Sequence, residues 1–264
     1  MGSLLRRDSS ARSAETPESG VSRSTLSNVV PAWLHQGRSL VQGDVCGYEI
    51  EGKRIVVKDF KRRLWLIRRW WGRWVLRREW ERLERLQGIA GIPRLIGWID
   101  ADAFAMEWLE AKRLPAAKRD SALEAIFFER LAKLVGEMHE RGIGHGDLRR
   151  KNVLVGVGQQ PYLVDFATAF RLGTSRHSRR LFERYRRIDD LKVVKLKHYY
   201  CPGSLTDEER ARLASRPLLL RVGQFMRSKI YRPFLKPRRW RRRWKRLRRF
   251  FSGAQPESDD PPER

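Results

Sequence analysis

The sequence predicts an α+β protein of two lobes, a small N-terminal lobe built on an antiparallel sheet and a larger, mainly helical C-terminal lobe. Two observations predict it. Short β-rich runs broken by glycines occupy residues 39–60, and similar runs return at residues 92–110. Helix-period apolar patterns dominate from Ala117 on, apart from one hairpin at residues 152–166. At 264 residues with 41% apolar side chains, the chain is long enough for one large domain or two lobes.

The first 30 residues carry arginines and serines but no apolar stretch behind them. This composition predicts a disordered lead-in and does not fit a secretory signal. We therefore expect the small lobe over residues 31–112 and the larger lobe over residues 113–235.

The small lobe begins with a strand meander. The run SLVQGDVCGYEIEGKRIVVKDF is interrupted at Gly43, Gly47 and Gly52, which predicts tight turns between short strands. Lys58 lies in the last of these strands. Two more strands are expected in IPRLIGWIDADAFAMEWLE, residues 92–110, around a turn at its aspartates.

A helix is predicted between these strand regions, in VLRREWERLERLQGI. Its inner stripe consists of residues at helical spacing, namely Leu76, Trp80, Leu83 and Leu86. At about 100° per residue, Glu79 falls close to that stripe, whereas Glu81 and Glu84 fall to its side or outside. One carboxylate of the three is therefore expected to point inward.

The larger lobe is predicted to contain three helices. The first, AIFFERLAKLVGEMHERG, ends at Gly142 as a C′ glycine. One of its faces is apolar, made of Phe127, Phe128, Leu131, Leu134, Val135 and Met138. Two further helices are expected in LFERYRRIDDLKVVKLKHYY and LTDEERARLAS, the second with a capping box at Thr206 and Glu209.

Polar residues gather at the ends of a predicted hairpin formed by NVLVGV and PYLVDF. Asp147 and Asn152 precede its first strand, and Asp165 ends the second. Because a hairpin brings its two ends together, two carboxylates and an amide carbonyl are expected at one edge. These oxygen ligands suit Mg²⁺ bound to substrate phosphates, although each residue alone is also common in turns.

The pattern H-G-D-L-x-x-x-N followed by a strand, a turn and D-F resembles the catalytic and metal-binding segments of the protein-kinase-like superfamily. The resemblance extends over roughly residues 38–200 and keeps the order of the other parts. Lys58 in IVVKDF resembles the third-strand lysine, Glu79 its helix partner, and residues 106–109 the hinge that contacts adenine. The resemblance therefore implies that the predicted two-lobed fold is a protein-kinase-like fold.

The resemblance implies a role for each site residue. Asp147 would orient the attacking hydroxyl as the catalytic residue, while Asn152 and Asp165 would hold Mg²⁺ on the phosphates of ATP. Lys58, oriented by Glu79, would contact the inner phosphates. ATP and Mg²⁺ are the implied cofactors. Because positioning and charge neutralisation carry most of this chemistry, the protein itself has little covalent work to do.

The sequence also departs from conventional protein kinases. No G-x-G-x-x-G precedes Lys58, and the best substitute is Gly43 with Gly47. Ala167 replaces the glycine of D-F-G, Gly146 replaces the arginine of H-R-D, and no A-P-E follows. The H-G-D form resembles atypical branches instead, namely the lipopolysaccharide-core sugar kinases, the RIO-like protein kinases, and the aminoglycoside and choline phosphotransferases.

A formal net charge of +26 and a pI near 11.1 predict an anionic partner. Residues 236–251 are predicted to form a basic amphipathic helix, with Trp240, Trp244, Leu247 and Phe251 on one stripe, before a disordered tail at 252–264. The arginines and tryptophans of residues 61–74 repeat this chemistry. An anionic membrane surface is the favoured partner, with nucleic acid as the alternative; a helix folded onto the protein with a solvated arginine face would explain the tail equally well.

The leading functional prediction is an ATP- and Mg²⁺-dependent kinase in the cytoplasm, peripheral at the inner face of the membrane. Its acceptor hydroxyl would belong to a lipopolysaccharide or another lipid-linked sugar. The alternatives are an atypical, RIO-like Ser/Thr protein kinase and a non-catalytic kinase-like scaffold that binds membrane or RNA.

Overall fold

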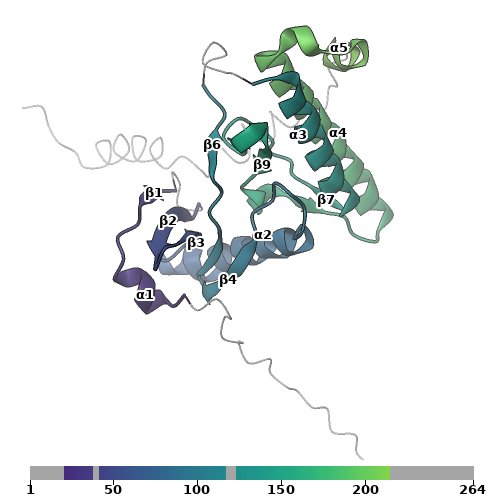
Figure 1. Ribbon diagram of the computed structural model, residues 1–264. Helices are drawn as coiled ribbons and strands as arrows, with labels where there is room; N and C mark the ends of the chain where they lie inside the picture. Colours follow the sequence, from purple (N-terminus) through teal and green to yellow (C-terminus); the bar gives the residue numbers. More distant parts are fainter. Residues whose placement is uncertain (1–20, 38–41, 117–122, 215–264) are drawn as a thin grey trace, which may run out of the picture.

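The computed structural model describes residues 21–37, 42–116 and 123–214, which form two lobes (Figure 1). The small lobe holds a five-stranded antiparallel sheet and helix α2, and the larger lobe is mainly helical. This arrangement confirms the predicted α+β, kinase-like fold class. The basic helix and disordered tail expected at residues 236–264 lie outside the described residues.

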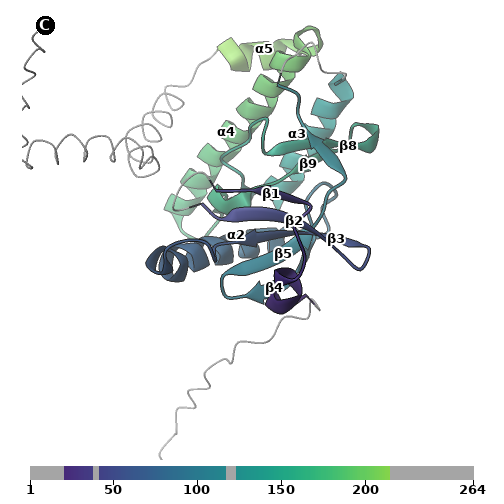
Figure 2. The same cartoon turned by 90° about the vertical axis from the view of Figure 1, so that its left-hand side faces the viewer.

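The sheet of the small lobe has the strand order β1-β2-β3-β5-β4 (Figure 2). Its strands are β1 (Trp33–His35), β2 (Asp44–Ile50), β3 (Lys53–Asp59), β4 (Leu95–Asp100) and β5 (Ala103–Glu107). The turn from β2 to β3 places Glu51 at φ 50° and Gly52 at φ 74°. Positive φ at both central residues is what a tight hairpin loop requires, as the glycine signal predicts.

Helix α1 (Arg23–Ser27) covers the outer face of the sheet, where Leu26 packs with Ile55 and Val57 of β3. The Arg23 guanidinium bonds to the carboxylates of Asp59 and Asp100. Residues 21–30 were expected to belong to a disordered lead-in, and that expectation is wrong for α1. The anchoring partners lie 36 and 77 residues away in sequence, so local composition could not reveal them.

Helix α2 (Arg73–Arg85) packs on the inner face of the sheet, directly after a π-helical segment, η1 (Ile67–Gly72). Leu76, Leu83 and Leu86 are buried and Trp80 is partly buried, which confirms the predicted stripe. The Trp80 ring lies 5.0 Å from Trp98 of β4. This aromatic contact holds the helix against the sheet.

The larger lobe contains α3 (Ala125–Glu140), α4 (Arg176–Tyr200) and α5 (Asp207–Ala214). All six residues of the predicted apolar face of α3 are buried. Gly142 has φ 73°, the left-handed conformation expected of a C′ glycine. At α5, the N–H of Thr206 donates to Glu209 (2.9 Å) and the N–H of Glu209 donates to Thr206 (3.2 Å), which confirms the capping box.

Two small sheets complete the larger lobe. One has the order β6-β8-β9, from β6 (Ala111–Arg113), β8 (Val153–Gly156) and β9 (Pro161–Leu163), and the other pairs β7 (Ile143–Gly144) with β10 (Phe170–Arg171). Strands β8 and β9 form the predicted antiparallel hairpin. The lobe boundary expected after residue 112 falls inside β6, which pairs with β8 of the larger lobe.

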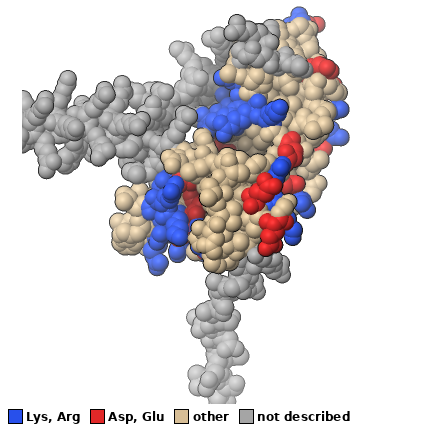
Figure 3. All heavy atoms as spheres, turned by 60° about the vertical axis from the view of Figure 1, so that its left-hand side comes forward, with Lys and Arg blue, Asp and Glu red and all other residues tan. Residues whose placement is uncertain are grey.

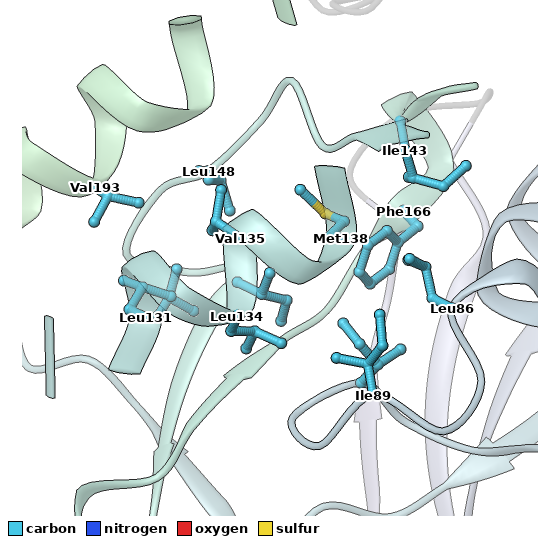
Figure 4. Close-up of a cluster of buried hydrophobic side chains, with 14 of the residues drawn as sticks. Leu86, Ile89, Leu131, Leu134, Val135, Met138, Ile143, Leu148, Phe166 and Val193 are labelled. Carbon is cyan, nitrogen blue, oxygen red and sulfur yellow. The ribbon is translucent and has the colours of Figure 1, made fainter. Parts of the chain in front are cut away.

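One hydrophobic core joins the two lobes (Figure 4). Leu86 and Ile89, which follow α2 directly, lie in the same cluster as Met138 of α3 and Phe166. Phe166 follows the β8–β9 hairpin. Its burial in this cluster therefore brings the polar end of the hairpin close to the small lobe. Within the described ranges, no helix is long and apolar enough to cross a membrane.

Candidate active site

Lys58 and Glu79 meet between the sheet and α2. The Lys58 Nζ donates to a carboxylate oxygen of Glu79 at 2.5 Å, and both side chains are buried. Strand alternation turns Ile55 and Val57 outward and Lys58 inward. Glu81 and Glu84 are exposed, so Glu79 is the carboxylate of this helix that points inward, as its helical phase predicts.

Lys58 and Glu79 are buried, and their opposite charges attract each other. Burial acts to lower the pKa of Lys58, but the carboxylates of Glu79 and Asp165 outweigh it and the pKa is raised. Burial raises the pKa of Glu79 and is only partly opposed by Lys58. Lys58 is therefore a fixed cation at neutral pH.

Asp165 brings the larger lobe to the same point, because its carboxylate lies 3.5 Å from the Lys58 Nζ. Burial acts to raise the pKa of Asp165, but Lys58 and Lys151 lower it and the net pKa is below its ordinary value. The backbone of Asp165 is left-handed, with φ 69° and ψ 69°. A non-glycine residue in this region is uncommon and is often found at functional sites.

Asp147 and Asn152 are held together at the entrance to the hairpin. The Asn152 Nδ2 donates to the backbone oxygen of Asp147 at 2.9 Å and to its carboxylate at 3.2 Å. Arg149 also contacts the Asp147 carboxylate, at 2.6 Å. Among the described residues, the Arg149 Nε is a buried donor with no hydrogen-bond acceptor.

His145 packs against this loop and helps to position it. Its side chain is fully buried and its ring lies 4.9 Å from that of Phe166. Its Nδ1 accepts from the N–H of Asp147, which leaves Nε2 to donate to the carbonyl of Val164 at 3.2 Å. Both ring nitrogens are thus occupied in positioning the loop.

Asp189 of α4 is a site residue that the sequence reasoning missed. It is fully buried, and its carboxylate accepts from the backbone N–H groups of His145 (2.7 Å) and Gly146 (2.9 Å). His139 of α3 contacts the same carboxylate at 3.2 Å. A signal was present, because Asp189 falls at helical spacing with the buried residues Phe182, Val193, Leu196 and Tyr200.

Gly146 stands in place of the H-R-D arginine for a steric reason. Its φ is 74°, and a Cβ there would lie 2.5 Å from the Tyr185 ring. A side chain would displace the backbone that Asp189 holds, so the glycine belongs to the loop geometry.

Arg82 is a second residue that was missed. It is buried on α2, and its Nε donates 2.7 Å to the carbonyl of Ala169, just past Asp165. Burial, reinforced by Arg78 and Arg171, lowers the pKa of Arg82. This contact ties the helix that carries Glu79 to the segment that carries Asp165.

The structure corrects the expected glycine substitute for the phosphate-covering loop. Gly47 lies inside β2, paired with Val56, and a Cβ on it would lie 2.3 Å from both Trp33 and Trp108. Gly47 therefore serves packing within the sheet. The local sequence could not show this, because both tryptophans are distant along the chain.

The connection from β1 to β2, residues 36–43, lies at the same end of the sheet as Lys58, because Val45 is the strand partner of Lys58. Residues 38–41 of it lie outside the described residues. Arg63 joins its two stems, donating to the carbonyls of Gln42 (2.8 Å) and Gly37 (3.3 Å) and contacting the buried Asp44 at 2.5 Å. The Asp44 carboxylate also accepts from the N–H of Gly37 at 2.8 Å.

The donor set fits Mg²⁺. The lowered pKa of Asp165 keeps its carboxylate ionised, and 35% of the side chain is exposed. Since the Nδ2 of Asn152 is directed at Asp147, its Oδ1 is the atom that can ligate a cation. One carboxylate and one amide oxygen are a usual protein contribution to Mg²⁺ that is also bound by phosphates. No group of three or more His, Cys, Asp or Glu side chains in the described ranges could hold a metal.

The RIO domain family matches residues 49–192 of the 264. The match includes the strand of Lys58, helix α2, the Asp147 loop, the hairpin ending at Asp165, and Asp189. It thus spans both lobes and the whole arrangement between them. The chain belongs to the RIO domain family, an atypical branch of the protein-kinase-like superfamily.

Proposed function

We propose that this protein is an ATP- and Mg²⁺-dependent phosphotransferase that acts as an atypical, RIO-like Ser/Thr protein kinase. The observation that carries the proposal is the convergence of Lys58 and Glu79 from the small lobe with Asp165 from the larger one, at 2.5 and 3.5 Å. Membership of the RIO domain family supports this acceptor class over the sugar acceptor that the sequence first suggested.

On the nucleotide side, Lys58 would bind the inner phosphates of ATP, with Glu79 fixing the direction of its ammonium group. Asp165 and the Oδ1 of Asn152 would hold Mg²⁺, which supplies neutralisation of the phosphate charge when it is bound. The ionised state of Asp165 follows from its lowered pKa. These side chains bind and orient; they need not react.

On the acceptor side, Asp147 would accept or orient the proton of the attacking hydroxyl. Its carboxylate is aimed by Asn152, and its backbone is placed by His145 and, through the neighbouring Gly146, by Asp189. Arg149, within 2.6 Å of the Asp147 carboxylate, has a side chain that is 39% exposed, so its guanidinium can donate to an oxygen of the transferred phosphoryl group. We propose that Arg149 stabilises that group during transfer.

A second acceptor, a hydroxyl on a lipopolysaccharide or other glycolipid, is favoured by one observation. Exposed tryptophans and leucines interleave with basic residues at residues 61–78, a composition suited to a membrane surface. In either case ATP is the donor, so we propose a cytoplasmic site of action, peripheral at the inner face of the membrane for the glycolipid acceptor.

The test is incubation of the full chain with γ-labelled ATP, Mg²⁺ and a cell lysate, followed by separation of protein, lipid and small molecules. We expect label in protein, and Asp147→Asn serves as the matched control that lowers it. Label in lipid alone would replace the protein acceptor by the glycolipid. Nucleotide binding without transfer to any fraction would overturn the enzyme and leave a non-catalytic scaffold that binds membrane or RNA.

A further inference from the structure

An exposed apolar surface surrounds the start of α2, on the side of the helix away from the sheet. Its members are large side chains with 41 to 72% of their area exposed, namely Leu64, Trp65, Leu66, Trp70, Trp71 and Trp74. All six lie within the 11-residue span 64–74, and they form half of the 12 exposed large apolar side chains in the described part of the chain. Exposed apolar groups gathered in this way indicate an interaction site. We call this set, with the basic residues among it, the Arg/Trp surface.

These apolar side chains are exposed because the opposite side of the helical segment packs against the core. A Cβ on Gly72 would lie 2.8 Å from the Phe60 ring, so this position faces the core, as Leu76 does one turn later. Trp74 lies two residues from Gly72, about 200° around the α-helix, and therefore faces outward. Trp70, in the π-helical segment before it, is 72% exposed. Two ion pairs also attach this segment to the turn between β4 and β5, because Arg68 and Arg73 contact the Asp102 carboxylate at 3.2 and 2.8 Å.

The same segment is strongly basic. Residues 61–78 contain eight Lys or Arg and no Asp or Glu. Lys61, Arg62, Arg69 and Arg77 are exposed, and the Arg78 guanidinium stacks on the Trp74 ring at 4.4 Å. In Figure 3, basic and uncharged side chains lie next to each other at the lower left, on the side where Figure 2 shows the start of α2.

We propose that the Arg/Trp surface docks on an anionic phospholipid bilayer, with the tryptophan and leucine side chains entering the interface and the exposed basic residues meeting lipid phosphates. This combination is what interfacial helices use, because apolar insertion and electrostatic attraction add. Tryptophan is also enriched at membrane interfaces.

Two features favour a bilayer over other partners. Leu64 and Leu66 are 63 and 55% exposed, and aliphatic side chains insert into lipid but cannot stack on bases as a nucleic-acid surface would require. A second copy of the chain would bring two surfaces of the same sign together, which is unfavourable.

The docking surface is separate from the candidate active site, although both use α2. Glu79 is buried on the inner side of the helix, whereas Trp70 and Trp74 face outward from its start. Substitutions on the surface should therefore leave nucleotide binding unchanged. The proposal does not depend on which acceptor is phosphorylated.

The test is co-sedimentation of the full chain with vesicles of phosphatidylglycerol and phosphatidylcholine, and with vesicles of phosphatidylcholine alone, at two salt concentrations. The apolar variant is Trp65→Ser with Trp70→Ser, and its control is Ile126→Ser with Val157→Ser on the larger lobe. The charge variant is Arg62→Glu with Arg69→Glu, and its control is Arg184→Glu with Arg187→Glu on α4. Each pair is also made in a chain carrying Trp240→Ser and Trp244→Ser, so that the basic segment at 236–251 does not hide the effect.

We expect wild type to bind the anionic vesicles, less strongly at high salt. The charge variant should raise the lipid concentration for half-maximal binding by about fivefold per basic residue lost. The apolar variant should also weaken binding but keep its salt dependence, and both control pairs should stay within about twofold of wild type. Thermal unfolding and nucleotide binding of each variant confirm that its fold is intact.

The proposal is overturned if the surface pairs bind vesicles as well as their control pairs do. It is also overturned if the surface variants lose affinity for a single-stranded oligonucleotide but keep their affinity for the vesicles. That result would assign the surface to nucleic acid. The wild type could also self-associate. If Trp65→Ser with Trp70→Ser abolishes that self-association without any loss of vesicle binding, the Arg/Trp surface is an interface with a second copy of the chain.

Discussion

At the scale of single residues, the charged side chains of the candidate site differ in how deeply they are buried. Lys58 and Glu79 are buried together, whereas Asp165 contacts Lys58 and remains partly exposed. Burial disfavours an isolated charge, so each of these groups depends on the others to stay ionised. Substitutions of different charged residues of the site should therefore affect nucleotide binding and turnover differently.

Asp165→Ala and Asp147→Asn should separate binding from turnover. Asp165→Ala removes the carboxylate expected to hold Mg²⁺ and should abolish binding of the Mg²⁺–nucleotide complex. Asp147→Asn keeps the shape of the side chain and should leave binding intact while lowering kcat by about 10²- to 10⁴-fold, the usual value of general base catalysis. Calorimetric titration with nucleotide and steady-state kinetics measure the two effects, and wild-type activity in both variants would refute the assignment.

Glu79→Gln should impair activity more than Glu81→Gln or Glu84→Gln. Only Glu79 is buried and bonded to Lys58, so its loss should reduce kcat/KM by about tenfold or more, equivalent to at least ~1.4 kcal/mol. The two exposed glutamates should change kcat/KM by no more than about twofold. A larger effect at Glu84 than at Glu79 would contradict the proposed function of the ion pair.

At the scale of secondary structure elements, buried charged side chains fasten elements that are far apart in the chain. Asp189 of α4 accepts two backbone N–H groups of the Asp147 loop, and Arg82 of α2 bonds to the segment after Asp165. Arg63 similarly joins the two ends of the β1–β2 connection beside Lys58. Each contact satisfies backbone groups that a helix or strand alone would leave open.

Arg63→Ala should raise the KM for ATP with a smaller effect on kcat. Without the guanidinium, the stems of the β1–β2 connection lose their shared donor and the buried Asp44 loses its cation. We expect a rise in KM of about fivefold and a loss of unfolding free energy of about 2 kcal/mol, the usual cost of a lost hydrogen bond to a charged group. Arg62→Ala, one residue away and exposed, is the matched control, and an unchanged KM in Arg63→Ala would exclude a positioning function.

At the scale of the whole molecule, the two lobes meet through one apolar core and through Lys58 and Asp165. A ligand that binds both lobes should stabilise the folded state, because binding free energy adds to folding free energy. The two lobes are therefore expected to respond together to Mg²⁺ and ATP.

ATP with Mg²⁺ should raise the midpoint of thermal unfolding of the full chain. At about 100 times the dissociation constant, the gain is ~2.7 kcal/mol, which corresponds to about 5 °C or more for a chain of this size. Removal of Mg²⁺ with EDTA should abolish most of the shift, and Asp165→Ala should show none. An equal shift in wild type and Asp165→Ala would mean that nucleotide binds elsewhere.

The sequence by itself determined the main elements of both lobes, although not α1, and the order of the site residues. The period of α2, the apolar face of α3, the β8–β9 hairpin and the capping box of α5 are all present as predicted. Local spacing fixes such features because their partners are three or four residues away or across one turn. The same spacing placed Glu79 inward and set Asp147, Asn152 and Asp165 at one end of the hairpin.

Only the tertiary structure decided which other polar residues belong to this arrangement. Arg23, Arg82 and Asp189 find their partners 77, 87 and 44 residues away. Helical spacing can place a charged side chain such as Asp189 on the buried face of its helix, but it cannot name the partner, because the contact exists only once the chain has folded over that side chain. For the same reason Gly47, predicted as part of a phosphate loop, proved to be a packing position beneath Trp33 and Trp108.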